Sequence, residues 1–284
     1  MATGPRPLRS HPQVADAGLV NAHDIPYAEL PVPVVLGQCV AGFWQRRMRD
    51  ADPGDRHHVL PDGCLDILCD LSPGRAPRLR VIGAMTRAIE VVAHGPVEVL
   101  AVRFRPGAAA AFLGPGIAEW RDQQVDLNEV WSDAEPLAER LSAAASTTER
   151  VAILAQRLSA ERARHGDIDR GSWAAVRLLE ADPTRSIGDL ARDLGITRQH
   201  LARSFRAQVG LEPKQLQRVL RMRRAVEQLR KGVAPLRVAL EVGYFDQSHL
   251  NAELKALTGL TPAAYRLARE WCHRDCDHCR PVAR

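Results

Sequence analysis

A run of residues occurs twice in the C-terminal third of this chain, with a period of 49 residues. The first copy is His200-Leu201 followed by Gly210-Leu211-Glu212-Pro213, and the second is His249-Leu250 followed by Gly259-Leu260-Thr261-Pro262. A glycine, Gly195 or Gly243, precedes each copy where two short apolar-periodic segments meet. Because a fixed period marks one supersecondary unit built more than once, the pattern predicts two helix-turn-helix units.

Positive charge gathers in the same region as the repeat. Residues 171–266 hold 16 Lys and Arg against 9 Asp and Glu, whereas the rest of the chain holds 23 against 25. The whole chain carries a formal net charge of +5. A local excess of positive charge is the electrostatic footprint of a region that meets phosphates, so we expect the repeat to bind nucleic acid.

The first unit is expected to hold the main recognition helix. Ser186 would cap a helix that buries Ile187, Leu190, Ala191 and Leu194, and Gly195 would make the turn. Thr197 would then cap a second helix, running to about Val209, with Leu201 and Phe205 facing inward. The outward face of this second helix carries Arg198, Gln199, Ala202, Arg203 and Arg206.

The outward face of the first recognition helix has the side chains that read DNA. Gln199 and Arg203 lie one turn apart, so both can enter the major groove and meet base edges. Arg198 and Arg206 are expected to hold phosphates, and Thr197 and His200 complete the expected DNA-binding set. The alternative is a basic helix face that is merely solvated.

A long helix is expected to join the two units, from Pro213 to about Lys231. It carries Arg218, Arg221, Arg223, Arg224 and Arg230, which either touch the DNA backbone or only solvate the helix. At 1.5 Å per residue its length is roughly 27 Å. A rod of that length suits two recognition helices about 34 Å apart, which is one turn of DNA.

The second unit has a more neutral outward face. Its first helix is expected to bury Leu236, Ala239, Leu240 and Val242, and Gly243 to make the turn. Asp246 would cap the second recognition helix, with Leu250 and Leu254 inward and Gln247, Ser248, Asn251, Ala252 and Lys255 outward. We therefore expect Gln247, Ser248, Asn251 and Lys255 to contact DNA with less base discrimination than the first unit.

The N-terminal part of the chain is expected to be rich in strands. Short β-branched runs separated by Pro, Gly and Asp turns occupy about residues 36–112, and helical patterns follow up to residue 165. Ser146 to Glu149 fits a capping box, before a helix striped with Val151, Leu154, Ala155 and Leu158. That stripe either packs on its own domain or forms a dimer contact.

These patterns predict an α+β chain, with a β-rich sensing domain, helices, and an all-α domain of two helix-turn-helix units joined by a long helix. The expected boundaries are a flexible tail over 1–30, the sensing domain over 31–165, a linker over 166–170, the DNA-binding domain over 171–267 and a Cys/His-rich tail over 268–284.

A polar effector pocket is one expectation for the β-rich domain. The candidate residues are Trp44, His57, His58, Asp62, Cys64, Asp66, Arg103 and Arg105. The alternative is structural, since Asp62-Gly63 suits a turn and the two arginines can pair with Asp62 or Asp66 to close the fold. The sequence does not name the effector.

The C-terminal tail concentrates thiols and imidazoles. Cys272, Cys276 and Cys279 lie within eight residues, together with His273 and His278. Such a cluster could bind zinc or another soft metal, or could be an unstructured reactive tail. Its spacing also resembles the cluster loop of radical enzymes that use S-adenosylmethionine, but no barrel-like alternation of strands and helices supports an enzyme. Otherwise no cofactor is expected.

Membrane insertion and export are not expected. No apolar run approaches the roughly 18–20 residues of a membrane span. The N-terminus has no apolar segment behind its arginines, so it does not resemble a signal peptide. We expect a cytoplasmic protein.

The run from Gly243 to Arg266 resembles the C-terminal signature of AraC/XylS-type bacterial transcription regulators, over about residues 170–267. Leu250, Leu254 and Ala252 depart from that signature, which usually has two phenylalanines and an arginine there. The segments 60–66, 81–83 and 102–107 are similar to the sensing domain of one group of these regulators.

The resemblance implies a seven-helix domain that binds double-stranded promoter DNA. It also implies RNA polymerase as a partner, an unidentified small-molecule effector, and a monomer or homodimer without enzymatic activity. Two alternatives stay open: a regulator that senses metal or thiol oxidation through its C-terminal cysteines, and an enzyme that depends on zinc or an iron–sulfur cluster there.

Overall fold

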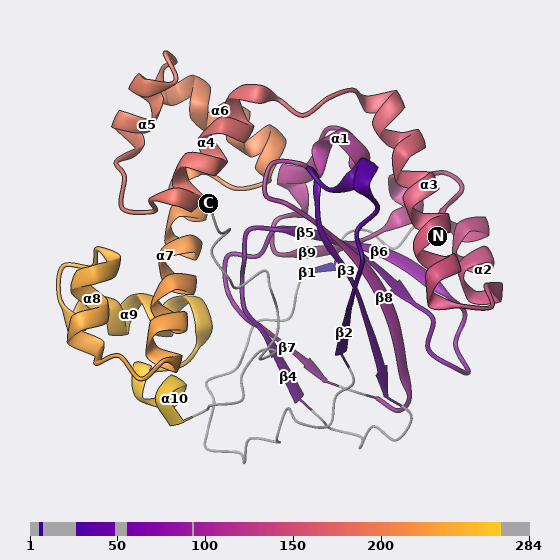
Figure 1. The fold of residues 1–284 in the computed structure, drawn as a ribbon, viewed down its shortest axis with the longest axis horizontal. Coiled ribbons are helices and arrows are strands. Elements are labelled where there is room, and N and C mark those ends of the chain that lie inside the picture. The colour runs from indigo at the N-terminus through magenta and orange to yellow at the C-terminus, as the bar shows by residue number, and fades with distance from the viewer. Residues whose placement is uncertain (1–5, 8–26, 49–55, 93, 268–284) are drawn as a thin grey trace.

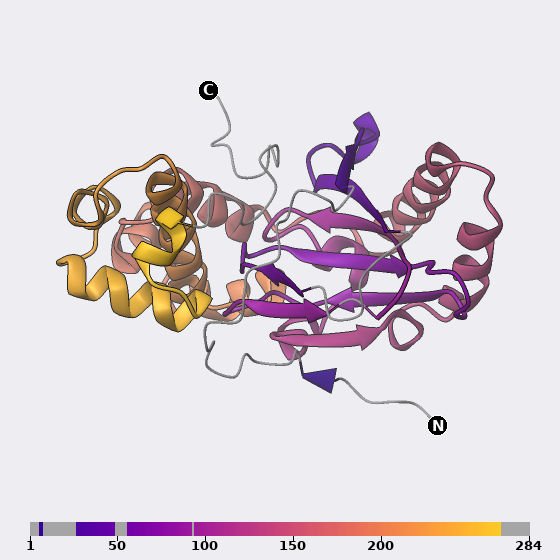
Figure 2. The same ribbon diagram turned by 90° about the horizontal axis from the view of Figure 1, so that it is seen from below.

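A strand-rich half and a helical half make up this chain (Figure 1). The computed structural model describes residues 6–7, 27–48, 56–92 and 94–267. Figure 2 shows the main sheet in the middle of the molecule, with the helical half on one side and α2 and α3 on the other. The expected α+β class, with strands first and helix-turn-helix units last, is confirmed.

The main sheet is antiparallel, with the strand order β1-β9-β6-β5-β8-β3-β2. Its strands are β1 (Arg6–Pro7), β2 (Tyr27–Leu30), β3 (Val40–Met48), β5 (Leu65–Asp70), β6 (Arg78–Ile82), β8 (Val97–Phe104) and β9 (Gln123–Asp126). A separate pair consists of β4 (Arg56–Val59) and β7 (Ile89–Val92). Side chains alternate along each strand, so Phe43, Ile67 and Val102 line up on the face that is packed into the core.

Helices cover the core face of the sheet. They are η2 (Val34–Leu36), α1 (Ala110–Leu113), η3 (Ile117–Trp120), η4 (Leu127–Glu129), α2 (Ala134–Ala143) and α3 (Thr147–His165). Ser146 caps α3 by accepting a hydrogen bond from the Glu149 amide, as expected of a capping box. Leu154 and Leu158 of α3 are buried in the same core as the sheet, so this helix packs on its own domain.

The helical half contains the two expected helix-turn-helix units. Its helices are α4 (Arg170–Ala181), α5 (Ile187–Asp193), α6 (Arg198–Val209), α7 (Pro213–Arg230), α8 (Pro235–Val242), α9 (Gln247–Thr258) and α10 (Pro262–Leu267). Gly195 and Gly243 turn the chain between α5 and α6 and between α8 and α9, with φ of 67° and 82°. Residues other than glycine rarely adopt that conformation, which explains glycine at both turns.

The expected buried face of α8 is partly wrong. Leu236 and Leu240 are 55% and 65% exposed, while Val238, Ala239 and Val242 face the core. The helix begins at Pro235, and its contacts with α7 and α9 select the face on which Val238, Ala239 and Val242 lie. At 3.6 residues per turn, Leu236 and Leu240 point about 200° away from Val238.

The two helix-turn-helix units differ in how they are buried. One hydrophobic core runs from the sheet through α1 and α3 into α4, α5, α6 and the first half of α7. A second core holds the rest of α7 with α8, α9 and α10, and Leu60 of the strand-rich half packs against it. The first unit therefore shares its core with the strand-rich half, whereas the second unit largely has a core of its own.

Truncation of Phe205 tests this shared core. The side chain is fully buried in α6, so Phe205→Ala should lower the free energy of unfolding by about 3–5 kcal/mol. Far-ultraviolet circular dichroism and tryptophan fluorescence should report the same shift in urea, because both halves share the core. Phe245→Ala, at an exposed position, should change the free energy by less than about 0.5 kcal/mol. Similar small effects for the two variants would contradict the shared core.

Candidate nucleic-acid interface

The first recognition helix, α6, is fixed at both ends. Thr197 Oγ1 accepts a hydrogen bond from the His200 amide at 3.1 Å, and Gly210 ends the helix with φ of 77°. Leu201, Phe205 and Val209 are buried. The opposite side is exposed and carries five of the side chains expected to contact DNA, Arg198, Gln199, His200, Arg203 and Arg206. The structure thus brings the first predicted set together on one surface.

Arg198 lies back over the preceding helix. A Cβ atom placed on Gly188 of α5 would collide with the Arg198 guanidinium, so the two residues are in direct contact. The guanidinium therefore sits beside α5 rather than extending straight from the start of α6. Arg203, one turn further on, stays exposed and lies 3.5 Å from Nδ1 of His200.

A polar network joins α6 to the start of the helical half. The Asp169 carboxylate caps α4 by accepting a hydrogen bond from the Ser172 amide at 2.7 Å, and it also accepts one from Ser204 Oγ of α6 at 3.3 Å. The Ser172 and Ser204 hydroxyls are 2.6 Å apart. Partial burial opposes the charged carboxylate, but the hydrogen bonds from these serines lower the pKa of Asp169.

The second recognition helix, α9, is built in the same way. Asp246 Oδ1 accepts a hydrogen bond from the His249 amide at 2.7 Å, and Leu250, Leu254 and Leu257 are buried. The other predicted contacts, Gln247, Ser248, Asn251 and Lys255, are all exposed. His249 packs edge-on against Tyr244 with ring centroids 5.3 Å apart, so this imidazole supports the turn.

Three arginines of the connecting helix α7 tie the two units together. Arg218 donates two hydrogen bonds, each 3.0 Å long, to the Glu253 carboxylate of α9. Arg221 donates to the Gly243 carbonyl and lies over the Tyr244 ring, and Arg224 donates to two carbonyls at the end of α4. These arginines have structural partners, which sequence periodicity alone could not identify.

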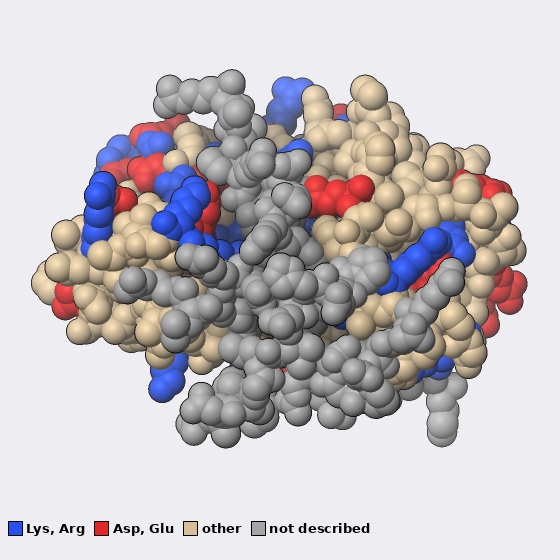
Figure 3. All heavy atoms as spheres, turned by 60° about the horizontal axis from the view of Figure 1, so that its bottom comes forward, with Lys and Arg blue, Asp and Glu red and all other residues tan. Residues whose placement is uncertain are grey.

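Lys and Arg side chains are prominent over the helical half, at the left of Figure 3, where they are interspersed with Asp and Glu. Several acidic side chains of the helical half pair with a nearby cation on the same helix or at its end, as in Arg192–Asp189, Lys231–Glu227 and Arg237–Glu241. Pairing leaves Arg198, Arg203 and Lys255 among the exposed cations for which no carboxylate partner is recorded in the described region.

The strand-rich half brings Asp62, Asp66 and Arg103 together. Arg103 donates from Nε and Nη2 to Asp66, at 3.0 and 2.8 Å, and lies 3.3 Å from Asp62. Burial raises the pKa of Asp66 above its ordinary value, and the Arg103 charge opposes that rise. Since these three groups satisfy one another, the geometry matches the structural alternative, and effector binding by them stays a prediction.

Two other predicted effector residues, Trp44 and Cys64, lie beside this group: the Trp44 side chain helps to lower the pKa of Asp66, and the Cys64 amide donates a 2.9 Å hydrogen bond to Asp62. Trp44 stacks on Tyr27 with ring centroids 5.7 Å apart, and the Arg105 amide bonds to the Cys39 carbonyl. His57 lies in β4 opposite Val91, but its side chain is outside the described part of the structure.

Burial raises the pKa of all three thiols of the strand-rich half. Burial, followed by the charge of Asp62, raises the pKa of the Cys64 thiol well above its ordinary value, so it stays protonated. Cys39, Cys64 and Cys69 are free thiols. No cluster of three or more metal-ligating side chains occurs among residues the structure describes, and Cys272, Cys276 and Cys279 lie outside them.

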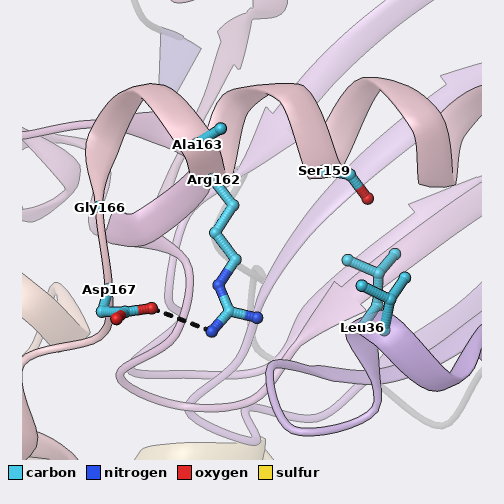
Figure 4. Close-up of a pocket in the computed structure, with 7 residues that line it drawn as sticks. Leu36, Ser159, Arg162, Ala163, Gly166 and Asp167 are labelled. Carbon is cyan, nitrogen blue, oxygen red and sulfur yellow. Dashed lines mark hydrogen bonds and ion pairs between the residues drawn. The ribbon is translucent and has the colours of Figure 1, made fainter.

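An open pocket of about 460 Å³ lies elsewhere, between η2 and the C-terminal end of α3. Figure 4 shows Arg162 reaching from α3 toward Asp167, with Leu36 across from Ser159. Val35, Ala163 and Gly166 complete the lining. Sequence reasoning missed this pocket because its walls are about 120 residues apart in the chain.

Among the helices that the structure describes, none combines the length and the apolar character needed to cross a bilayer.

Two families match this chain. Residues 190–268 match a family described as a helix-turn-helix domain, and residues 29–126 match a domain of unknown function, DUF6597. The two matches fall on the helical half and on the strand-rich half.

Curated relatives match the chain in part. A protein named as an AraC-like transcription regulator from Streptomyces lividans is 37% identical over 120 residues, covering 39% of this chain and 40% of that protein. One so named from Streptomyces antibioticus is 35% identical over 96 residues, covering 33% and 32%. The bifunctional transcriptional activator/DNA repair enzyme Ada of Escherichia coli is 32% identical over 108 residues, covering 36% and 30%.

This chain therefore spans 40% or less of the length of each of these relatives. The helix-turn-helix match, over residues 190–268, includes both turns, at Gly195 and Gly243, and both capped, outward-facing helices. The chain thus has a helix-turn-helix domain at residues 190–268, preceded by a match to DUF6597 at residues 29–126, and part of it is similar to two proteins named as AraC-like transcription regulators.

Proposed function

We propose that this protein is a sequence-specific transcription regulator that binds double-stranded promoter DNA and catalyses no reaction. The observation that supports this function best is the pair of recognition helices, α6 and α9, joined by one helix. Each is capped by a side chain and buried on one face, and each leaves a polar face exposed. That arrangement suits insertion into successive major grooves.

The two recognition helices would contribute differently to binding. Gln199 and Arg203 have the donors and acceptors that recognise adenine and guanine, and they lie one turn apart on α6. Arg198 and Arg206 would hold phosphates, with Thr197 and His200 at the same surface. On α9, the polar side chains Gln247, Ser248, Asn251 and Lys255 would read DNA with less discrimination, because that face has no arginine to bind guanine with two hydrogen bonds.

Control by an effector would reach both units through the strand-rich half. The Ala88 amide donates a 2.7 Å hydrogen bond to the Leu257 carbonyl at the end of α9. On the first unit, a Cβ atom at Gly107 would touch Val176 of α4 and Val209 of α6. A change in the strand-rich half would therefore alter the placement of both recognition helices.

The protein partner of this regulator would be RNA polymerase. The regulator would act in the cytoplasm, as a monomer or as a homodimer.

The function is tested by the binding of the full-length protein to duplex DNA. Selection from random duplexes should yield a preferred site, and the affinity for it should fall steeply with salt concentration. Absence of salt-sensitive binding to any duplex would contradict the proposal.

Arg203→Ala tests base reading. The variant should lose about 1–3 kcal/mol of binding to the preferred duplex and relax the preference at one base pair, because a bidentate contact is removed. Arg192→Ala is the control, since Arg192 is also exposed but pairs with Asp189 on α5. Anisotropy titrations on matched and mismatched duplexes measure both effects. An equal loss on every sequence would make Arg203 a phosphate contact.

Gly188→Ala tests the placement of Arg198. Alanine favours the helix, so folding should be retained, but its Cβ would push the Arg198 guanidinium aside. Affinity should fall several-fold and by a similar factor on all duplexes, as expected of a phosphate contact. Gly171→Ala is the control, because its Cβ would meet Asp169 at an ordinary 3.6 Å. Unchanged affinity in Gly188→Ala would contradict the role of Arg198.

Metal sensing by Cys272, Cys276 and Cys279 is a separate proposal that rests on the sequence alone. Metal analysis of protein purified without oxygen should find about one zinc or other soft metal per chain, and deletion of 268–284 should remove it. This role would be contradicted if the purified protein held no metal and if neither zinc nor oxidants changed its affinity for DNA.

A further inference from the structure

The pocket beside α3 has two features that a solvated surface seldom combines. Its lining includes an exposed apolar side chain, Val35 of η2, which is 65% exposed, and the neighbouring Val34 is 99% exposed. Backbone hydrogen bonds hold this turn in place, from Leu36 to Pro33, from Gly37 to Val34 and from Cys39 to Leu36. The valines are therefore held toward solvent by the backbone, next to a concave surface of about 460 Å³, a volume within the range of small-molecule sites.

The second feature is the Arg162 guanidinium, whose carboxylate partner, Asp167, is held only weakly. Arg162 lies 3.1 Å from Asp167, and the Asp167 side chain is 89% exposed whereas that of Arg162 is 28% exposed. An ion pair with so exposed a carboxylate contributes little stability. A ligand carboxylate delivered into the pocket would be better shielded from water, and it could engage the planar guanidinium with both oxygens.

We propose that this pocket binds a carboxylic acid with an apolar chain, whose carboxylate replaces Asp167 on Arg162 and whose chain packs against Val35. The Ser159 hydroxyl already donates to the Ala155 carbonyl, so Arg162 would be the group that holds the ligand carboxylate. Arg164 and His165 do not compete for the carboxylate, because both engage Glu161.

Occupancy would be communicated to the recognition helix, an inference that rests on the proposed function. Gly166, with φ of 88°, ends α3, and Asp167 follows directly. Two residues later, Asp169 bonds both to the Ser172 amide of α4 and to Ser204 of α6. Release of Asp167 from Arg162 would loosen the segment between α3 and α4. Asp169, which is hydrogen-bonded to Ser204 of α6, lies in that segment.

Calorimetry with octanoate and with octanamide tests the site on the full-length protein. Octanoate should bind saturably, and octanamide, which has the same chain without the charge, at least tenfold more weakly. Arg162→Gln should abolish the preference for the acid, whereas Arg164→Gln, on an exposed position of the same helix, should keep it.

Asp167→Asn should change the affinity for octanoate in the direction opposite to Arg162→Gln. Removing the competing carboxylate should tighten octanoate binding several-fold, an increase that a misfolded variant would not give. No saturable binding of octanoate by the natural sequence, equal binding of the amide, or weaker binding by Asp167→Asn would each overturn the site.

Measuring DNA affinity with and without octanoate tests the pocket and the proposed regulator function separately. Octanoate should change the affinity for the preferred duplex about fivefold or more, and Ser204→Ala should reduce that response while octanoate still binds. Octanoate binding without any DNA binding would leave the pocket standing and reject the regulator. DNA binding without octanoate binding would reject the pocket and leave the regulator standing.

Discussion

Burial of the inner face of α6 is the interaction on which the rest of the structure depends. Leu201, Phe205 and Val209 are buried in the same hydrophobic core as the sheet, so the first recognition helix is packed against the strand-rich half as well as against its own unit. Such a core is close-packed and resists small displacements. The direction in which Arg203 points is therefore set jointly by both halves of the chain.

The second unit is attached by fewer and more polar contacts. Its own core includes Leu250 and Leu254, and it connects to the first unit through α7 and the Arg218–Glu253 pair. The Ala88–Leu257 hydrogen bond adds a direct link to the strand-rich half. Because single polar contacts rearrange more readily than a shared core, the distance between α6 and α9 can respond to changes that leave α6 in place.

Much of the helical half was predictable from the chain because its determinants are local. Caps at Ser186, Thr197 and Asp246 act within three residues, and the turns at Gly195 and Gly243 need a conformation that favours glycine. The partners of Arg218, Arg221 and Arg224 were not predictable, because they lie 22 to 44 residues away in the chain. The same holds for the buried face of α8, which depends on neighbouring helices rather than on hydrophobicity alone.

The sequence by itself determined a duplicated helix-turn-helix, the residues that face outward from each recognition helix, and a strand-rich region before them. Periodicity, capping and turn chemistry act over a few residues, so they can be read from the chain. Only the tertiary structure decided that Asp62, Asp66 and Arg103 satisfy one another, that Arg198 rests on Gly188, and that η2 meets α3 around a pocket. Those outcomes depend on contacts between residues distant in sequence, which no local pattern encodes.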